Sequence, residues 1–454
     1  MVNRFSISLV VCLVVAGATV CAQNPAPMAK PESLGLRIPA NRDAIEVNDR
    51  RVLVSSGEFA GNEPVVAKVY LEIGSHYVVM LPDGSLQSLA KRETTPTDRP
   101  FEAMDKDDLA EKLKREFPGF KTRATRRYLC VYNTDDGFCE RKSAILETMY
   151  PLLVSFLKRQ KLDVTKPDTP LIVVMFRTKK EFLKYREMPE SLMAYYNGVN
   201  NRVFLYQYSD VAKDAPMIAA MQSTSMIAHE GVHQILHNVG VQKRLSDWPI
   251  WISEGLAEYF APTSASRSKW SGVGKPNHLR MRALFEHLRE TPGVGSGAMI
   301  RRLVNAESLT STDYAIAWAL THYLATKRKS DLFAYVREVA DSTPLTKRYD
   351  NMELFEKHFE DDYAKIEREM IKHIQGLPYS NPVLNQPYFL VSATTGKRRL
   401  ATITSSKDHL ATKKELVKKL NPQERARVRF YPVRVFPNML TAKQAMQLFT
   451  SGGR

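Results

Sequence analysis

The chain has 454 residues, of which 44% are hydrophobic and 25% are charged, and its formal net charge is +16. The length allows two or three domains with at least one sizeable core, which excludes a single small module, and the composition is ordinary for a globular protein apart from the charge. A basic balance is most simply a well-solvated basic exterior, and it also suggests acidic partners, namely nucleic acid, an anionic membrane surface or wall polymers.

Residues 1–22 have the pattern of an export signal peptide. Arg4 supplies a positive start, residues 8–19 are mostly apolar, and Val20-Cys21-Ala22 offers a small-residue cleavage site. Because the apolar run is too short for a comfortable membrane span, we expect no transmembrane span in the mature chain. The protein is therefore expected to be exported, whether periplasmic, secreted or at the cell surface. A lipoprotein anchored through Cys21 is the alternative, which the bulky Val20 disfavours.

A linker and a small β domain are expected next. Residues 23–50 contain four prolines and are typical of a tether. Residues 51–102 contain short stretches rich in valine and tyrosine with a turn at Pro82-Asp83-Gly84, which predicts a small all-β unit, a barrel. Ser56-Gly57-Glu58-Phe59, Tyr77–Gly84 and Asp98 resemble the SH3-like homology domain of an endocytic adaptor. That resemblance implies binding rather than catalysis.

Residues 103–125 are charged and predict a helical connector, and the largest domain follows at residues 126–378. Hydrophobic periodicity predicts both strands and helices in this domain. The expected strands are Tyr128–Tyr132, Leu171–Phe176 and Arg202–Tyr206, and the expected helices are Lys142–Lys158, Lys179–Tyr185 and Met217–Asn238. Strands first and helices after indicate an α+β fold class, with a small mixed sheet and a helical lobe.

Cys130 and Cys139 are the cysteines that remain once the signal is removed. In an oxidising compartment, an even pair that closes a short loop is expected to form a disulfide, and the turn-forming residues between them would let the ends meet. Two free buried thiols are the alternative. Because no histidine lies at ligand spacing from this pair, we do not expect a second metal site there.

His229-Glu230-Gly231-Val232-His233 lies within the expected helix Met217–Asn238. Two histidines four residues apart share one face of a helix, so both rings can reach one metal ion. The glutamate between them can accept a proton from a metal-bound water. Two unrelated core or surface histidines are the alternative, because so short a pattern also arises by chance. A third ligand is therefore needed.

Glu254 is the candidate third ligand. It follows His233 after twenty intervening residues, and Pro249 fits the first turn of a second helix that could present it to the histidines. Glu258, one turn further on, either supports a ligand or replaces Glu254 as the ligand. His237 continues the histidine face and is expected to be a polar residue at the helix end.

The five-residue motif together with Trp251-Ile252-Ser253-Glu254-Gly255-Leu256-Ala257 resembles the gluzincin clan of metallopeptidases, which includes thermolysin and the aminopeptidase N type. Trp251–Phe260, Met193–Tyr196 and Arg202–Tyr206 are similar to a family of exported bacterial peptidases of unassigned substrate. The resemblance covers roughly residues 126–340. It implies a gluzincin-like catalytic domain in which His229, His233 and Glu254 bind Zn2+ and Glu230 is the general base.

Asp313–Leu320 resembles the place where aminopeptidase-type members carry a tyrosine hydrogen-bond donor. Hydrolysis of a peptide bond requires stabilisation of an oxyanion, so Tyr314 is the candidate for this catalytic role. A packed core tyrosine is the alternative, and His322 and His278 are weaker candidates.

Aminopeptidases of the clan carry a Gly-x-Met-Glu-Asn strand whose glutamate binds the free amine of the substrate. The comparable strand here, Asn201–Tyr208, has no acidic residue, and the next one is Asp210. This departure favours cleavage inside a chain. Arg202–Tyr206 is expected to be either an edge strand that pairs with an extended peptide or an ordinary sheet strand.

Residues 379–454 are expected to form a small basic α/β module. From Lys397 to Arg454 there are fourteen Lys or Arg and three Asp or Glu, a net charge of +11. The module is a candidate to bind an anionic cell-surface or wall polymer. Nucleic acid is disfavoured, because few aromatic residues are placed for base stacking.

The sequence thus predicts an exported zinc metallopeptidase, an endopeptidase that acts on a protein or peptide substrate with Glu230 as general base. The alternative is a non-catalytic cell-surface or wall-binding protein that keeps a peptidase fold, which the two flanking modules motivate.

Overall fold

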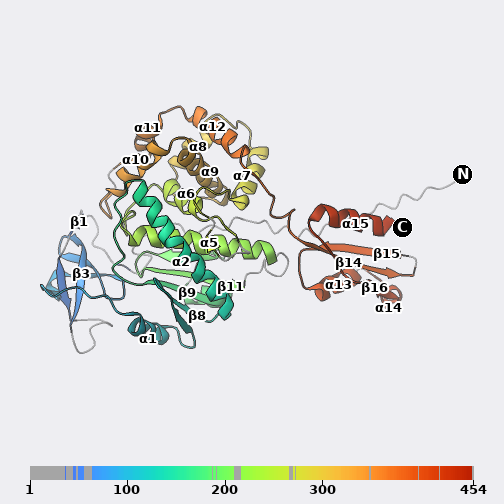
Figure 1. The fold of residues 1–454 in the computed structure, drawn as a ribbon, viewed down its shortest axis with the longest axis horizontal. Coiled ribbons are helices and arrows are strands. Elements are labelled where there is room, and N and C mark those ends of the chain that lie inside the picture. The colour runs from blue at the N-terminus through green and yellow to red at the C-terminus, as the bar shows by residue number, and fades with distance from the viewer. Residues whose placement is uncertain are drawn as a thin grey trace.

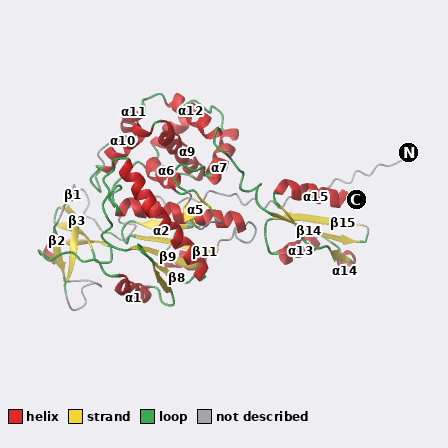
Figure 2. Ribbon diagram, in the orientation of Figure 1, coloured by secondary structure: helices red, strands yellow, loops and turns green. Residues whose placement is uncertain are grey.

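The structure is a computed structural model of the chain (Figures 1 and 2). It describes residues 36, 44–47, 50–55, 64–186, 188–190, 192–208, 216–264, 269–270, 272–346, 349–396, 398–418 and 420–451. The proposed signal peptide, including Cys21, and the motif Ser56-Gly57-Glu58-Phe59 lie outside the described residues. Within the described part, no helix has both the length and the apolar character that a membrane span requires.

An antiparallel sheet forms the N-terminal part of the described chain. Its alternating apolar residues, such as those of β3, are buried while the intervening ones are partly exposed. The order is β5-β4-β3-β2-β6, with β1 beside β3. The strands are β1 (Ile45–Glu46), β2 (Arg51–Val54), β3 (Val65–Ile73), β4 (His76–Met80), β5 (Leu86–Ala90) and β6 (Thr94–Pro96), with the short helix η2 at Lys91–Glu93.

This sheet is open, so the expected closed barrel is wrong for the described strands: β5 and β6 end the path and do not pair with each other. The physical reason is where the sheet buries its apolar surface. One face packs around Val199 of the larger domain, with Leu245 and Leu345 beside it, instead of closing on itself. The larger domain therefore supplies part of the core that a barrel would have formed alone.

The main sheet has the order β10-β11-β9-β8-β7. Its three central strands β8, β9 and β11 are parallel, and the two edge strands are antiparallel to their neighbours, so the sheet is mixed as predicted. The central strands are continuous apolar runs, since helices cover both faces. The strands are β7 (Lys121–Ala124), β8 (Tyr128–Tyr132), β9 (Leu171–Thr178), β10 (Ala194–Asn197) and β11 (Arg202–Tyr208).

Of the two expectations for Arg202–Tyr206, the edge strand is wrong and the ordinary sheet strand is confirmed. β11, which contains it, pairs with β9 on one side and with β10 on the other. The edge is instead β10, from the segment Met193–Tyr196. The short hairpin between β10 and β11 places β10 there, and a strand of four residues was too short to identify from periodicity.

Among the described residues, four helices cover the main sheet. α2 and α5 lie over one face, and α1 lies on the other side (Figure 1). α1 begins at the cap Asp105, whose carboxylate accepts from two backbone N–H groups, and α3 begins at a Thr178–Glu181 capping box. These helices are α1 (Lys106–Glu116), α2 (Asp136–Arg159), α3 (Lys179–Tyr185) and α5 (Pro216–Asn238). Leu109 and Leu113 of α1 belong to the main core, so the expected connector is packed into this domain.

A helical lobe follows and shares one hydrophobic core with the sheet. α9 lies at its centre, buried on nearly all sides, and contacts α6, α7, α8, α10 and α12. The lobe comprises α6 (Ile250–Phe260), the hairpin β12 (Thr263–Ser264) and β13 (Lys269–Trp270), α7 (His278–Glu290), α8 (Ala298–Val304), α9 (Ser311–Lys327), α10 (Lys329–Ala340), α11 (Asn351–Phe359) and α12 (Tyr363–Gln375). The described chain is thus of the α+β class, as predicted.

The C-terminal segment forms a smaller sheet with its own helices, to one side of the larger body (Figure 1). β14 is its central strand, with β15 on one side and β16 and β17 on the other, all antiparallel. The elements are β14 (Tyr388–Thr395), β15 (Arg398–Thr404), α13 (His409–Lys418), α14 (Pro422–Ala426), β16 (Val428–Phe430), β17 (Arg434–Phe436) and α15 (Met439–Ser451).

Cys130 and Cys139 are both free and buried, so the expected disulfide is not formed in this structure. Cys130 lies on β8 and Cys139 lies in the first turns of α2. Contact with the Cys139 thiol and burial together raise the pKa of Cys130 well above its usual value. The two thiols therefore act as small apolar groups of the main core, which was the alternative reading of the sequence.

Candidate metal centre

α5 presents both histidines of the motif from one face. His229 and His233 are one turn apart and are 0% and 6% exposed. From Met226 to His237 every residue of the helix is buried, because the sheet, α2 and α6 surround it. Gly231, on the opposite side, allows α2 to approach, since a Cβ at this position would overlap Leu146.

α6 brings Glu254 to the histidines. It begins at Ile250, directly after Pro249, and is buried from Trp251 to Phe260. Gly255 lets α6 lie against α9, because a Cβ there would overlap the Thr321 side chain and meet the Ala317 carbonyl at 3.0 Å. The close packing of α6 between α5 and α9 fixes the position of the glutamate.

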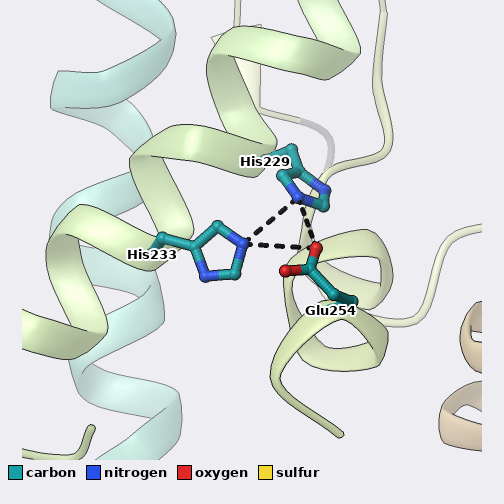
Figure 3. Close-up of side chains that lie close together, drawn as sticks. All are labelled: His229, His233 and Glu254. Atoms are coloured by element: carbon teal, nitrogen blue, oxygen red, sulfur yellow. Dashed lines mark hydrogen bonds and ion pairs between the residues drawn. The ribbon is translucent and has the colours of Figure 1, made fainter. Parts of the chain in front are cut away.

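Three donor atoms converge between these two helices (Figure 3). His229 Nε2 lies 3.1 Å from Glu254 Oε2 and 3.2 Å from His233 Nε2, and His233 Nε2 lies 3.5 Å from Glu254 Oε2. Ligands about 2.0–2.2 Å from a tetrahedral ion would be separated by roughly 3.3–3.6 Å, which is close to these distances. The cluster is buried and could bind a metal ion.

The electrostatics of the cluster favour a cation. Burial opposes charge on His229, but the carboxylates of Glu254 and Glu258 outweigh it and raise the pKa of His229 to about 10. Burial likewise opposes ionisation of Glu254, but the positive charges of His233 and His229 lower the pKa of Glu254 to about 2. Two buried carboxylates, those of Glu254 and Glu258, therefore stabilise positive charge here.

Glu258 holds the other side of His229. Its Oε1 lies 3.1 Å from His229 Nδ1, while His229 Nε2 faces the ligand cluster. The same carboxylate forms an ion pair with Arg280 and accepts a hydrogen bond from Asn277 Nδ2 at 3.1 Å. Glu258 thus lies behind the histidine and not in the ligand cluster, which favours its supporting role over its role as an alternative ligand.

Glu230 lies beside the cluster and is 2% exposed. Its Oε2 accepts a hydrogen bond of 2.8 Å from the backbone N–H of Tyr196 on β10. Its Oε1 has no hydrogen-bond partner among the described residues. Burial raises the pKa of Glu230. A carboxylate with one oxygen fixed, one oxygen unpaired and a raised pKa is suited to accept and return a proton.

Tyr314, on α9, is brought to the cluster. The centroids of the Tyr314 and His229 rings lie 6.3 Å apart, and the Arg280 guanidinium lies 5.2 Å from the centroid of the Tyr314 ring. Tyr314 is 1% exposed, and burial raises its pKa well above the usual value. It therefore remains protonated and able to donate a hydrogen bond.

The remaining histidines proposed from the sequence lie elsewhere. His322 Nδ1 is 2.9 Å from His373 Nε2, and His322 Nε2 is 3.2 Å from the Gly274 carbonyl. His278 begins α7, where its Nδ1 accepts from the Ser380 N–H at 3.4 Å. His237 is buried and stacks on the Tyr196 ring with centroids 5.3 Å apart, as a non-ligand at the end of α5.

Sequence reasoning missed Tyr196, Asn277 and Arg280 as parts of this centre. Asn277 is recognisable as the cap of α7, since its side chain accepts from the Arg280 N–H. No local pattern, however, could have shown that the caps and first turn of α7 meet Glu258 on α6. Tyr196 contacts Glu230 through its backbone N–H. Because every residue except proline carries such a group, the amino acid at this position does not indicate the contact. Asp210, the next acid after β11, lies outside the described residues.

Comparison with known families gives one match. Residues 223–346 match the family described as a protein of unknown function, DUF1570. No curated protein matches the chain. The matched segment includes both histidines, Glu254, Glu258, Arg280 and Tyr314, so the whole centre except its contact with β10 lies within it.

Proposed function

We propose that this chain is a zinc-dependent metallopeptidase that hydrolyses peptide bonds. The observation that carries the proposal is the convergence of His229, His233 and Glu254 beside the buried carboxylate of Glu230. Two imidazoles and one carboxylate are a donor set that catalytic zinc uses, and three protein ligands leave one position for water or substrate. The motif and the second helix resemble the gluzincin clan, in which these positions have these roles.

Two histidines and one carboxylate also occur in non-haem iron oxygenases, so the ligand set alone does not select the metal. Glu230 favours zinc and hydrolysis. Its unpaired Oε1 and its raised pKa suit a proton carrier, which hydrolysis of an amide requires at two steps. An oxygenase has no need for a buried base between its two histidine ligands.

When bound, zinc would lower the pKa of a water molecule and polarise the substrate carbonyl. Glu230 accepts the proton at Oε1 and delivers it to the leaving amine, while the Tyr196 N–H holds Oε2 in place. Glu258 fixes the orientation of the His229 ring. The hydroxyl of Tyr314 is the candidate donor to the oxyanion.

An internal peptide bond is the preferred substrate in this proposal. Between Asn201 and Tyr208 there is no carboxylate that could anchor a free amine beside the centre. β10, the edge strand of the main sheet, leads directly to the Tyr196–Glu230 contact, so an extended polypeptide pairing with this edge would pass next to the base. Both features support an endopeptidase.

We place the protein outside the cytoplasm, after removal of residues 1–22, and assign the basic C-terminal module to an anionic cell-surface or wall polymer. The net charge of +11 between Lys397 and Arg454 supports this assignment. The competing function is a binding protein that keeps the fold without turnover. Retention of a buried, partly unpaired Glu230 argues against it, because a desolvated carboxylate is costly to keep without a use.

The test combines metal analysis of the purified full-length protein with digestion of a peptide library. We expect one zinc per chain and cleavage within peptides. Glu230→Gln is the matched variant, because the amide oxygen can still accept from Tyr196 while the base is lost; it should retain zinc and lose at least about a hundredfold in kcat. Iron in place of zinc, or undiminished cleavage by Glu230→Gln, would refute the proposal.

A further inference from the structure

The N-terminal sheet is joined to the larger domain at the tip of the β10–β11 hairpin, residues 198–201. The backbone N–H of Leu86 donates to the Val199 carbonyl at 2.7 Å. The Val199 side chain enters the apolar cluster of the N-terminal sheet. Gly84, in the turn before Leu86, has a φ of +84°, and a Cβ there would overlap Thr169 and approach Asn201. Only a glycine turn lets the two domains approach this closely.

Arg244 lies at the centre of this junction and is 4% exposed. Its Nε donates to the Gly198 carbonyl at 2.6 Å, its Nη2 to the Val199 carbonyl at 2.7 Å, and its Nη1 to the Gly84 carbonyl at 2.8 Å. Its own carbonyl accepts from the Tyr70 hydroxyl at 3.0 Å. One guanidinium therefore ties the N-terminal sheet to the hairpin through three carbonyls, a geometry that its planar fork provides and an ammonium does not.

The hairpin in turn holds Glu230. Tyr196, whose N–H binds the Glu230 carboxylate, is two residues before Gly198. The Tyr196 hydroxyl donates to Asn201 Oδ1 at 2.9 Å, so the strand and the tip move as one unit. One path from Arg244 to the carboxylate thus runs through the hairpin.

We propose that Arg244 is a positioning residue through which the N-terminal sheet holds the Tyr196 N–H against Glu230. The N-terminal sheet is then part of the catalytic apparatus and not an independent binding module. This inference rests on the proposed role of Glu230 as general base.

The hairpin also has bonds of its own, because Asn197 Oδ1 accepts from the N–H groups of Val199 and Asn200. If these sufficed, loss of Arg244 would lower stability and leave the Tyr196–Glu230 contact intact. The test must therefore follow that contact directly. Residue-resolved amide hydrogen exchange of Tyr196 does so without any need for activity.

The experiment uses the full-length Arg244→Met protein and a matched control, Lys243→Met. Lys243 is the preceding residue and forms an ion pair with Glu46 of the same N-terminal sheet, but it does not bind the hairpin carbonyls. In Arg244→Met we expect exchange of the Tyr196 amide to rise at least about tenfold, since opening of the hairpin tip becomes easier. We expect kcat to fall by about tenfold or more with KM nearly unchanged. Lys243→Met should match the unmodified protein in both.

Unchanged exchange of the Tyr196 amide in a folded Arg244→Met protein overturns the inference. If that variant does not fold, Arg244→Lys replaces it. One ammonium cannot span three carbonyls, so exchange of the Tyr196 amide should still rise in Arg244→Lys. Exchange equal to that of Lys243→Met overturns the inference. A third outcome separates the two proposals: Tyr196 exchange rises in Arg244→Met, but the unmodified protein cleaves no peptide. This outcome would support the positioning role of Arg244 and refute the proposed function.

Discussion

The two ring nitrogens of His229 face different carboxylates, and this arrangement distinguishes the carboxylate in the candidate metal cluster from the one that supports the histidine. Nε2 lies 3.1 Å from Glu254, within the ligand cluster, and Nδ1 lies 3.1 Å from Glu258. A histidine that ligates through one nitrogen needs a partner at the other to fix its tautomer and ring orientation. Glu258 is itself held by Arg280 and Asn277, so the buried negative charge has a counter-ion.

Glu258→Gln should therefore weaken metal binding without removing a ligand. Loss of a carboxylate partner of a ligating histidine costs about 10–100-fold in affinity, and we expect a decrease in this range. Competition with a chelator of known zinc affinity measures it. Glu286→Gln is the control, because Glu286 pairs with Arg282 on the same lobe and away from the cluster. Equal affinities in the two variants would contradict the role of Glu258.

A second residue of interest is Lys142 on α2, which is 4% exposed and contacts α5. Its Nζ donates to Ser223 Oγ at 2.8 Å and to Thr224 Oγ1 at 3.1 Å. Burial lowers the pKa of Lys142 to about 7. Between pH 7 and the ordinary pKa of 10.5, the folded state therefore binds fewer protons than the unfolded state. The free energy of unfolding consequently decreases as the pH falls through this window.

Lys142→Met should consequently raise the free energy of unfolding, and the gain should shrink as the pH rises. Each pKa unit is worth about 1.4 kcal/mol and the lysine is half protonated near pH 7, so the gain should be about 2 kcal/mol smaller at pH 9 than at pH 7. Denaturant unfolding at both values measures it. Lys158→Met, at an exposed position of the same helix, should show no such pH dependence. A gain that is constant with pH would show that Lys142 is charged in the folded protein.

At the scale of elements, the centre depends on two close helix contacts made at glycines. Gly231 of α5 faces Leu146 and Met149 of α2, and Gly255 of α6 faces Thr321 and the Ala317 carbonyl of α9. Alanine is the better helix former by about 1 kcal/mol, so propensity alone would favour it at both positions. Packing reverses this preference, because a side chain would push α5 away from α2 or α6 away from α9, and α5 and α6 carry the candidate metal cluster.

Gly255→Ala should lower the free energy of unfolding by about 1–3 kcal/mol, and Gly231→Ala by less. At Gly255 the added methyl group meets a backbone carbonyl, which cannot move alone, whereas at Gly231 it meets the ends of flexible side chains. Gly137→Ala is the control, since the nearest atom to a Cβ there is the end of the Arg141 side chain at 3.1 Å. It should be neutral or stabilising, and a loss equal to that of Gly255→Ala would contradict the packing argument.

At the scale of the whole molecule, the two flanking parts are attached differently. The N-terminal sheet shares an apolar cluster with Val199 and is bound by the buried Arg244. The C-terminal module forms its own sheet. It contacts the larger body through a hydrogen bond from the Ser380 N–H to His278 Nδ1 at the start of α7. The first attachment buries polar groups that cannot be left unpaired, whereas at the second Ser380 and Tyr379 are exposed and His278 is only partly buried.

Removal of residues 379–454 should therefore leave the melting temperature of the remaining body and its metal content nearly unchanged, as measured by calorimetry and metal analysis. It should abolish salt-sensitive retention on an anionic polysaccharide column, because it removes a net charge of +11 within Lys397–Arg454. Removal of the N-terminal sheet, residues 44–97, should instead destabilise the body. Retention that survives the C-terminal deletion would place the polyanion surface elsewhere.

The sequence by itself determined the main strands and helices and the residues of the candidate metal cluster. Strands Leu171–Phe176 and Arg202–Tyr206 and the helix Met217–Asn238 were predicted close to β9, β11 and α5, because their periodicity is local. The α+β class followed from their order. His229 and His233 were predicted from a spacing of one helical turn, and the structure brings Glu254 to them from a second helix, as expected.

Only the tertiary structure decided the rest. In the structure the N-terminal sheet is open and packs against Val199, and β10 is the edge strand of the main sheet. Cys130 and Cys139 are free thiols, and Glu258 lies behind His229. The tertiary structure also joined Arg244 and Tyr196 to the site. Each of these outcomes depends on contacts between residues distant in the chain, or on backbone groups that every residue carries, and neither leaves a periodic pattern in the sequence.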